Sequence, residues 1–111
     1  MARPLKVWGA QSYVERGPVH AALVARGLPE HVVQCRIIVS APSGAAAMRA
    51  MGLTRAEWQH SGCETGNAVE VALGLAQPGQ VFVASLDYGR DDPDGYVPVT
   101  ADAYGNVTLK P

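Results

Sequence analysis

The stretch that decides the fold is residues 43–76, SGAAAMRAMGLTRAEWQHSGCETGNAVEVALGLA. Ser43 is a suitable N-cap, and the Ala-rich segment after it predicts a helix over residues 45–51, which Gly52 ends. The small side chains of this helix would let it lie close to a sheet. The rest of the chain is organised around this helix and the two that follow it.

Two further capping patterns mark where those helices begin. Thr54 and Glu57 form a capping box, in which each side chain accepts from the backbone N–H of the other residue. Asn67 and Glu70 repeat this spacing and predict a third helix over residues 68–76, ended by a Pro-Gly pair. Apolar residues at helical spacing give the third helix an expected buried stripe of Val69, Ala72, Leu73 and Ala76.

Extended segments flank the helices on both sides. Alternating and β-branched residues predict strands over residues 5–14 and 32–41 before the helices, and over 81–86, 97–101 and 107–109 after them. The sequence therefore predicts an α+β fold within one domain of residues 1–111. We expect a small, mostly antiparallel sheet with the three short helices packed on one face.

Two segments leave alternatives open. Residues 18–26 are compatible with a short helix and equally with an irregular crossover. Gly9, inside the first strand, indicates either a bulge or a close approach of another part of the chain. The polar segment 87–95 is typical of an exposed turn, and residues 103–106 are expected to close a hairpin.

The charge of the chain is small but unevenly distributed. The net charge of −1 gives no overall field toward nucleic acid or a membrane. Residues 1–66 carry seven basic and four acidic residues, whereas residues 67–111 carry two basic and six acidic. With two cysteines, no secretory signal and no apolar run long enough to span a bilayer, we expect a cytoplasmic protein with free thiols and no membrane contact.

Residues 48–61 fit a helix-turn-helix template. Gly52 occupies the turn, and Met51, Leu53 and Trp58 occupy the expected apolar positions. The template has a small residue four positions before the turn glycine, where this chain has Met48. A corner formed by two packed helices is the alternative interpretation.

If the helix-turn-helix reads nucleic acid, its contact residues follow from which side chains face outward. Arg55, Gln59 and His60 lie on the exposed side of the second helix, where Arg and Gln can hydrogen-bond base edges, and Arg49 on the first helix can hold a phosphate. We therefore predict a nucleic-acid-binding site formed by Arg49, Arg55, Gln59 and His60. The local positive charge is small for this role, because the neutralisation of phosphates supplies most of the affinity for nucleic acid.

Other residue groups resemble sites without meeting their requirements. His31, Cys35, His60 and Cys63 are enough ligands for zinc in number, but Cys35 lies in a predicted strand and His60 ends a helix. Cys63 near His60 could form a nucleophile pair, although a capping loop explains the segment better. Asp92 and Asp94 fail the calcium-loop pattern. We expect no metal, no cofactor and no catalytic residue, and hence not an enzyme.

Two aromatic residues on the first strand are candidates for binding a partner protein. Trp8 and Tyr13 lie on opposite faces of that strand, so one of them is expected to be available to a partner. This gives a second hypothesis, a module that binds and modulates a host protein. The oligomeric state stays open, and a homodimer is compatible with the sequence.

The order of several short motifs resembles a family of small uncharacterised proteins from actinobacteria and especially their phages. The motifs are KVWG from residue 6, RIIV from residue 36, GLT from residue 52, CETGN from residue 63 and PGQVF from residue 78, so the resemblance covers about residues 5–83. It implies a non-enzymatic accessory product, located in the host cytoplasm if phage-encoded. It implies no catalytic residues.

Overall fold

The computed structural model describes residues 4–14, 18–25, 33–85, 95–101 and 107–109. Within them the chain forms a six-stranded sheet in the order β3-β1-β2-β4-β5-β6, and every neighbouring pair is antiparallel. The strands are β1 (Lys6–Val14), β2 (Val33–Ala41), β3 (Cys63–Glu64), β4 (Val81–Ser85), β5 (Val97–Ala101) and β6 (Val107–Leu109). The predicted α+β fold with an antiparallel sheet is confirmed.

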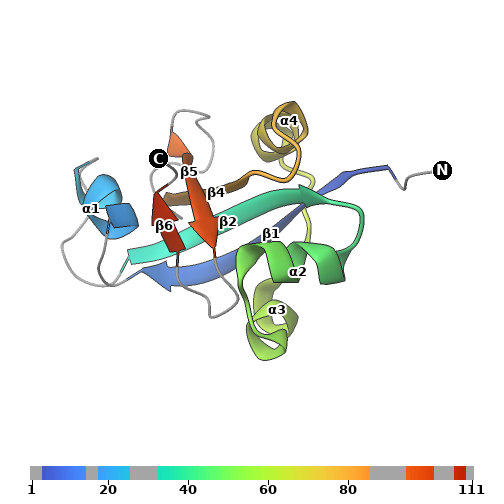
Figure 1. Cartoon of the computed structure of the whole chain (residues 1–111), viewed down its shortest axis with the longest axis horizontal. Helices are drawn as coiled ribbons and strands as arrows, with labels where there is room; N and C mark the ends of the chain where they lie inside the picture. Colours follow the sequence, from blue (N-terminus) through green and yellow to red (C-terminus); the bar gives the residue numbers. More distant parts are fainter. Residues whose placement is uncertain (1–3, 15–17, 26–32, 86–94, 102–106, 110–111) are drawn as a thin grey trace.

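Four helices accompany the sheet in the described part of the chain: α1 (Pro18–Val24), α2 (Gly44–Met51), α3 (Arg55–Ser61) and α4 (Ala68–Ala76). Figure 1 shows α2 and α3 on one side of the sheet and α4 on the other. The prediction that the three central helices share one face is therefore wrong. After α3 the chain pairs with the edge of β1 as β3, and the Thr65 N–H bonds to the Val7 carbonyl at 2.9 Å, so the chain reaches the opposite face before α4 begins.

Strand alternation divides the core into two layers. On β2, Cys35, Ile37 and Val39 belong to the buried cluster that includes Ala47 and Met51 of α2. The intervening side chains point the other way, because successive residues of a strand face opposite sides of the sheet. Ile38 accordingly joins Val7, Phe82, Ala84 and Tyr96 in a second cluster under α4.

Local sequence signals fix where the helices begin and end. The Ser43 Oγ accepts from the Ala46 N–H at 3.2 Å, and Gly52 ends α2 with a left-handed φ of 70°. The predicted capping box before α3 is present, since Thr54 and Glu57 exchange hydrogen bonds of 2.9 and 3.2 Å. These bonds satisfy backbone donors that a helix start otherwise leaves without a partner.

The predicted elements agree closely with the observed ones. The strands at residues 97–101 and 107–109 and the helix at 68–76 have the predicted bounds, and the short helix near residue 18 is formed. The two-residue strand β3 was expected to be a loop. The predicted turns at 87–95 and 103–106 lie outside the described residues, apart from Gly95.

Candidate nucleic-acid interface and a buried ion-pair network

The apolar positions that the helix-turn-helix template expects in α2 and α3 are buried or partly buried. Ala47 and Met51 of α2 are buried against the sheet. Leu53, in the connection, and Trp58, in α3, are partly buried and pack against the same cluster. The pair therefore rests on a β-sheet, and its apolar positions all face that sheet.

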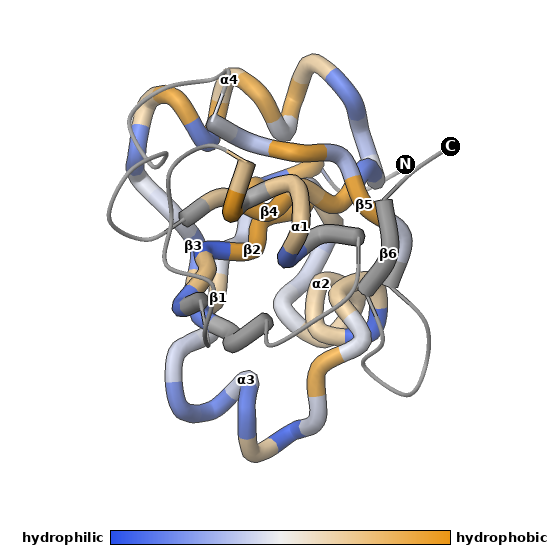
Figure 2. The backbone as a smooth tube through the Cα atoms, turned by 90° about the vertical axis from the view of Figure 1, so that its left-hand side faces the viewer, coloured by the Kyte–Doolittle hydropathy of each residue, from blue (hydrophilic) through white to orange (hydrophobic). Residues whose placement is uncertain are grey.

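The four predicted contact residues are all exposed. Arg49 lies on α2, and Arg55, Gln59 and His60 lie on α3, a helix that has no buried residue. Figure 2 shows α3 as a hydrophilic segment that projects away from the hydrophobic strands. The structure thus brings these side chains onto one protruding element and its neighbour.

The nearest acidic residues of the helix region have other partners. The Glu57 carboxylate accepts from the Thr54 N–H in the capping box, and Glu64 pairs with Lys6 at 3.6 Å. Over the residues that the structure describes, neither Arg49 nor Arg55 takes part in an ion pair. Both arginines are therefore exposed, and no carboxylate in the described ranges is bound to them.

The two predicted partner-binding aromatics differ in what the structure shows. Trp8 is partly buried, donates its Nε1–H to the Ala41 carbonyl at 3.1 Å and packs against Trp58 with ring centroids 6.2 Å apart. Its ring is thus already engaged within the domain. The side chain of Tyr13 lies outside the described part of the chain.

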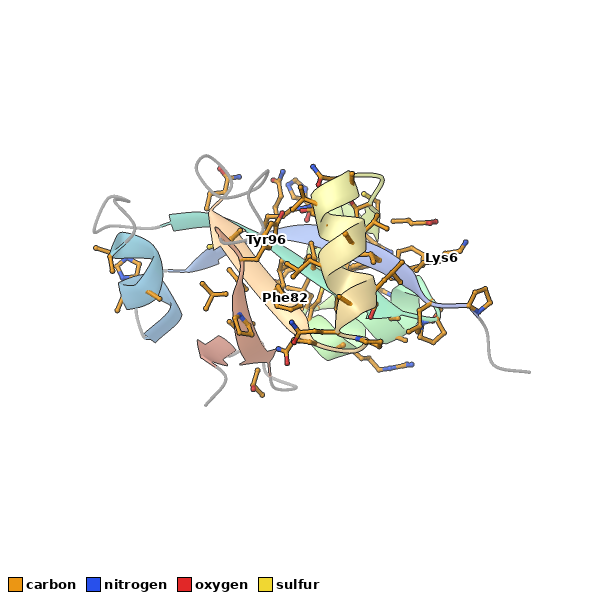
Figure 3. The ribbon with its side chains drawn as sticks, turned by 90° about the horizontal axis from the view of Figure 1, so that it is seen from above. Lys6, Phe82 and Tyr96 are labelled. Atoms are coloured by element: carbon orange, nitrogen blue, oxygen red, sulfur yellow. The ribbon has the colours of Figure 1, made fainter. Side chains whose placement is uncertain are left out.

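A buried polar network lies beneath α4, on the other face of the sheet. Arg36 of β2 binds the Glu70 carboxylate with both ends of its guanidinium, Nε to Oε2 at 2.9 Å and Nη2 to Oε1 at 3.1 Å. Thr65 donates to Oε1 at 2.6 Å, and Tyr96 donates to Oε2 at 2.7 Å. Figure 3 looks down on α4, with Tyr96 beside it. Glu70 is 0% exposed and Arg36 6% exposed.

Four hydrogen bonds keep this buried carboxylate ionised. Burial alone raises the pKa of Glu70, but the bonds from Arg36, Thr65 and Tyr96, with the positive charge of Arg36, outweigh burial and lower the pKa below its ordinary value. Among the described residues, no buried side-chain polar atom lacks a hydrogen-bond partner. The network is therefore a satisfied structural unit, which is the condition for a buried charge to be tolerated.

Gly9 makes room for the guanidinium. A Cβ built on Gly9 would overlap the Nη2 and Cζ atoms of Arg36. Of the two predictions for this glycine, the close approach is the correct one, because β1 and β2 pair continuously through this position without a bulge. Any larger residue at position 9 would push Arg36 away from Glu70.

Sequence reasoning missed the network because it assigned Glu70 to a capping box. The Asn67 side chain does accept from the Glu70 N–H at 3.1 Å, so half of that assignment is correct. The Glu70 carboxylate instead turns into the core, and the Asn67 N–H donates to the Thr65 hydroxyl. Two signals pointed to the pairing: one acid within the apolar helix AVEVALGLA, and one arginine within the β-branched strand around residue 36.

The predicted buried stripe of α4 is half correct. Val69 and Leu73 are partly buried and pack against the cluster under α4, whereas Ala72 and Ala76 are exposed. The fully buried residues of α4 are Glu70 and Gly74, and a Cβ on the glycine would come within 2.7 Å of Val7. The ion pair and this close contact set the rotation of α4, and its apolar residues line an open hollow along the helix.

Of the residues considered for metal binding or catalysis, the structure describes Cys35, His60 and Cys63. Cys35 is buried at the centre of the sheet, where burial raises the pKa of its thiol to about 11, whereas Cys63 is exposed on the edge strand β3. His31, Asp92 and Asp94 lie outside the described residues. In the part of the chain that the structure describes, no three His, Cys, Asp or Glu side chains form a group that could hold a metal ion.

Comparisons with protein-family models, with curated proteins and with solved structures find no match to this chain. None of the helices in the described ranges has the length and apolar character needed to cross a membrane.

Proposed function

We propose that this chain is a non-enzymatic accessory protein of the phage type that contacts nucleic acid, with DNA as the expected ligand, through α2 and α3. The observation that carries the proposal is the state of the two arginines. Arg49 and Arg55 are exposed, and the acidic residues nearest in sequence bind other groups. A cation free of an internal partner can neutralise a phosphate at little cost.

The residues of α3 supply the remaining chemistry. Arg55 and Gln59 are one helical turn apart, so their side chains lie on the same side of the helix. Both residue types can make paired hydrogen bonds to base edges. His60 follows Gln59 in the same helix and Arg49 is exposed on the preceding helix, so both are available to contact phosphates.

The test is binding of a fluorescent duplex DNA, followed by anisotropy at about 50 and 200 mM salt. Two or three phosphate contacts predict that affinity falls roughly tenfold or more between these conditions. Arg55→Ala is expected to weaken binding about tenfold. Lys6→Ala removes an exposed cation of β1 that is already paired with Glu64 and serves as the control, with an effect of less than about twofold.

Two results would overturn the proposal. One is the absence of binding at low salt. The other is equal loss of affinity in Arg55→Ala and Lys6→Ala, because binding would then depend on general charge and not on the α2–α3 surface.

A further inference from the structure

The attachment of α3 to the rest of the domain depends on very few contacts. The helix has no buried residue. Its described contacts with the sheet run through the Trp58 ring and through Ser61, whose hydroxyl accepts from the Gln11 N–H at 3.0 Å on the edge of β1. Such a helix needs a specific anchor if its outer face is to keep one orientation.

Trp58 has the surroundings of such an anchor. Its ring packs on Trp8 with an interplanar angle of 54°, and Trp8 is itself fixed by the bond from its Nε1–H to the Ala41 carbonyl at the end of β2. Gly44, at the start of α2, lies against both rings: its Cβ would be 3.3 Å from Trp58 and 3.4 Å from Trp8. The two tryptophans thus connect the sheet, α2 and α3.

Gly62 also lies directly against the Trp58 ring. Its φ of −74° and ψ of 130° are accessible to any residue, so the backbone does not require glycine here. The ring does, because a Cβ on Gly62 would overlap its atoms. The Gly62 N–H also bonds to the Trp58 carbonyl at 2.6 Å, which holds the glycine over the ring.

We infer that Trp58, which packs against Trp8 and Gly62, is the positioning residue that fixes the orientation of α3 and therefore of Arg55 and Gln59. This inference rests on the proposed function for its consequence in binding. The seat itself, defined as Trp8, Trp58, Gly44 and Gly62, is a property of the protein that can be measured without any ligand.

The experiment compares Gly62→Ala with Gly66→Ala. Gly66 is exposed, and a Cβ at that position would meet nothing within 4 Å, so it is a matched control in the same loop region. Amide hydrogen exchange in the ligand-free protein measures how firmly the seat holds α3. We expect the amides of α3 to exchange about tenfold faster in Gly62→Ala, with those of β2 unchanged, and no effect in Gly66→Ala.

Binding is then measured with the same duplex DNA. We expect Gly62→Ala to lose about tenfold in affinity, as Arg55→Ala does, because misplaced side chains lose hydrogen-bond geometry. Trp8→Phe keeps a ring but removes the donor to Ala41. It gives a second and milder disturbance, which keeps the inference testable if Gly62→Ala does not fold. Near-ultraviolet circular dichroism of the tryptophan pair should change in both variants and not in Gly66→Ala.

The outcomes separate the two proposals. Unchanged exchange in α3 in both Gly62→Ala and Trp8→Phe would overturn the inference, whatever the DNA result. Faster exchange in α3 with undiminished DNA binding would also overturn it, since orientation would then not matter. If the wild-type protein binds no DNA at all, the proposed function fails, and the exchange data still decide whether Trp58 positions α3.

Discussion

The two faces of the sheet are held by different chemistry. Toward α2 and α3, the buried contacts are almost entirely apolar, with Ile37, Val39 and Met51 among the least exposed residues. Toward α4, an apolar cluster is joined to the charged pair of Arg36 and Glu70. The same strand, β2, contributes alternate side chains to both faces.

This difference shows how far apolar packing and an ion pair can each fix the orientation of a helix on the sheet. Apolar contacts are not directional, so on the α2 face the orientation of α3 needs the tryptophan seat in addition. The ion pair on the α4 face has fixed bond directions and lets α4 dock in one rotation, although that rotation leaves apolar side chains outside. A buried ion pair adds little net stability compared with apolar packing, but removing one partner is costly. The two faces should therefore respond differently to mutation.

The largest effect is expected for Glu70→Ala. It leaves the Arg36 guanidinium, Thr65 and Tyr96 without their shared acceptor, and we expect a loss of about 3–5 kcal/mol in the free energy of unfolding, measured by urea titration. The double variant Arg36→Met/Glu70→Leu removes both charges and should regain part of this loss. A double variant as unstable as the two single variants combined would show that the pair is not the cause.

The apolar face should respond to Met51→Ala by a different mechanism. Met51 is 0% exposed, and its truncation leaves a cavity beneath α2, for which we expect about 3 kcal/mol lost in the same titration. Leu75→Ala, at an exposed apolar position of α4, is the control and should cost less than about 0.5 kcal/mol. Equal effects of the two variants would contradict the assigned burial.

Acid should weaken the network on the α4 face. The pKa of Glu70 in the folded protein lies below its ordinary value of 4.5, so the network contributes fully above that pH and its contribution is lost as the pH falls through the lower folded pKa. The stability difference between wild type and Glu70→Gln should therefore shrink as the pH is lowered from 5 toward 3 (about the range in which carboxylates titrate). A difference that stays constant with pH would assign the acid response to other groups.

The smallest effect is expected for Tyr96→Phe. This change removes one of the bonds to the Glu70 carboxylate and keeps the aromatic ring, for which we expect a loss of about 1–2 kcal/mol. The same change made in Glu70→Ala should cost much less, because its partner is already gone. A double-mutant cycle over these variants measures the coupling energy, and a value near zero would contradict the hydrogen bond.

Much of the fold could be predicted from local signals. The capping box of Thr54 and Glu57 begins α3, Gly52 ends α2, and the β-branched run after Arg36 forms the central strand. Each of these depends on residues close together in the sequence. The exposure of Arg49, Arg55, Gln59 and His60 also followed from helical spacing combined with the apolar positions.

The features that could not be predicted depend on contacts between distant residues. Arg36 and Glu70 are 34 positions apart, and Glu70 and Tyr96 are 26 apart. The periodicity of α4 predicted its buried side only in part, because the ion pair places Glu70 at the centre of the packed side, with Val69 and Leu73 partly buried beside it. The chain likewise reaches the other face of the sheet because β3 pairs with β1. A strand of two residues is too short to show a recognisable sequence pattern.

The network under α4 also has a consequence for the order in which the chain folds. Its carboxylate gains its last donor only when Tyr96 arrives, and that residue follows β4 in the chain. Until then, docking α4 would bury Glu70 with fewer partners, at a cost in free energy. On a ribosome, α4 can therefore close onto the sheet with its full set of bonds only after the polypeptide has grown past β4 to Tyr96.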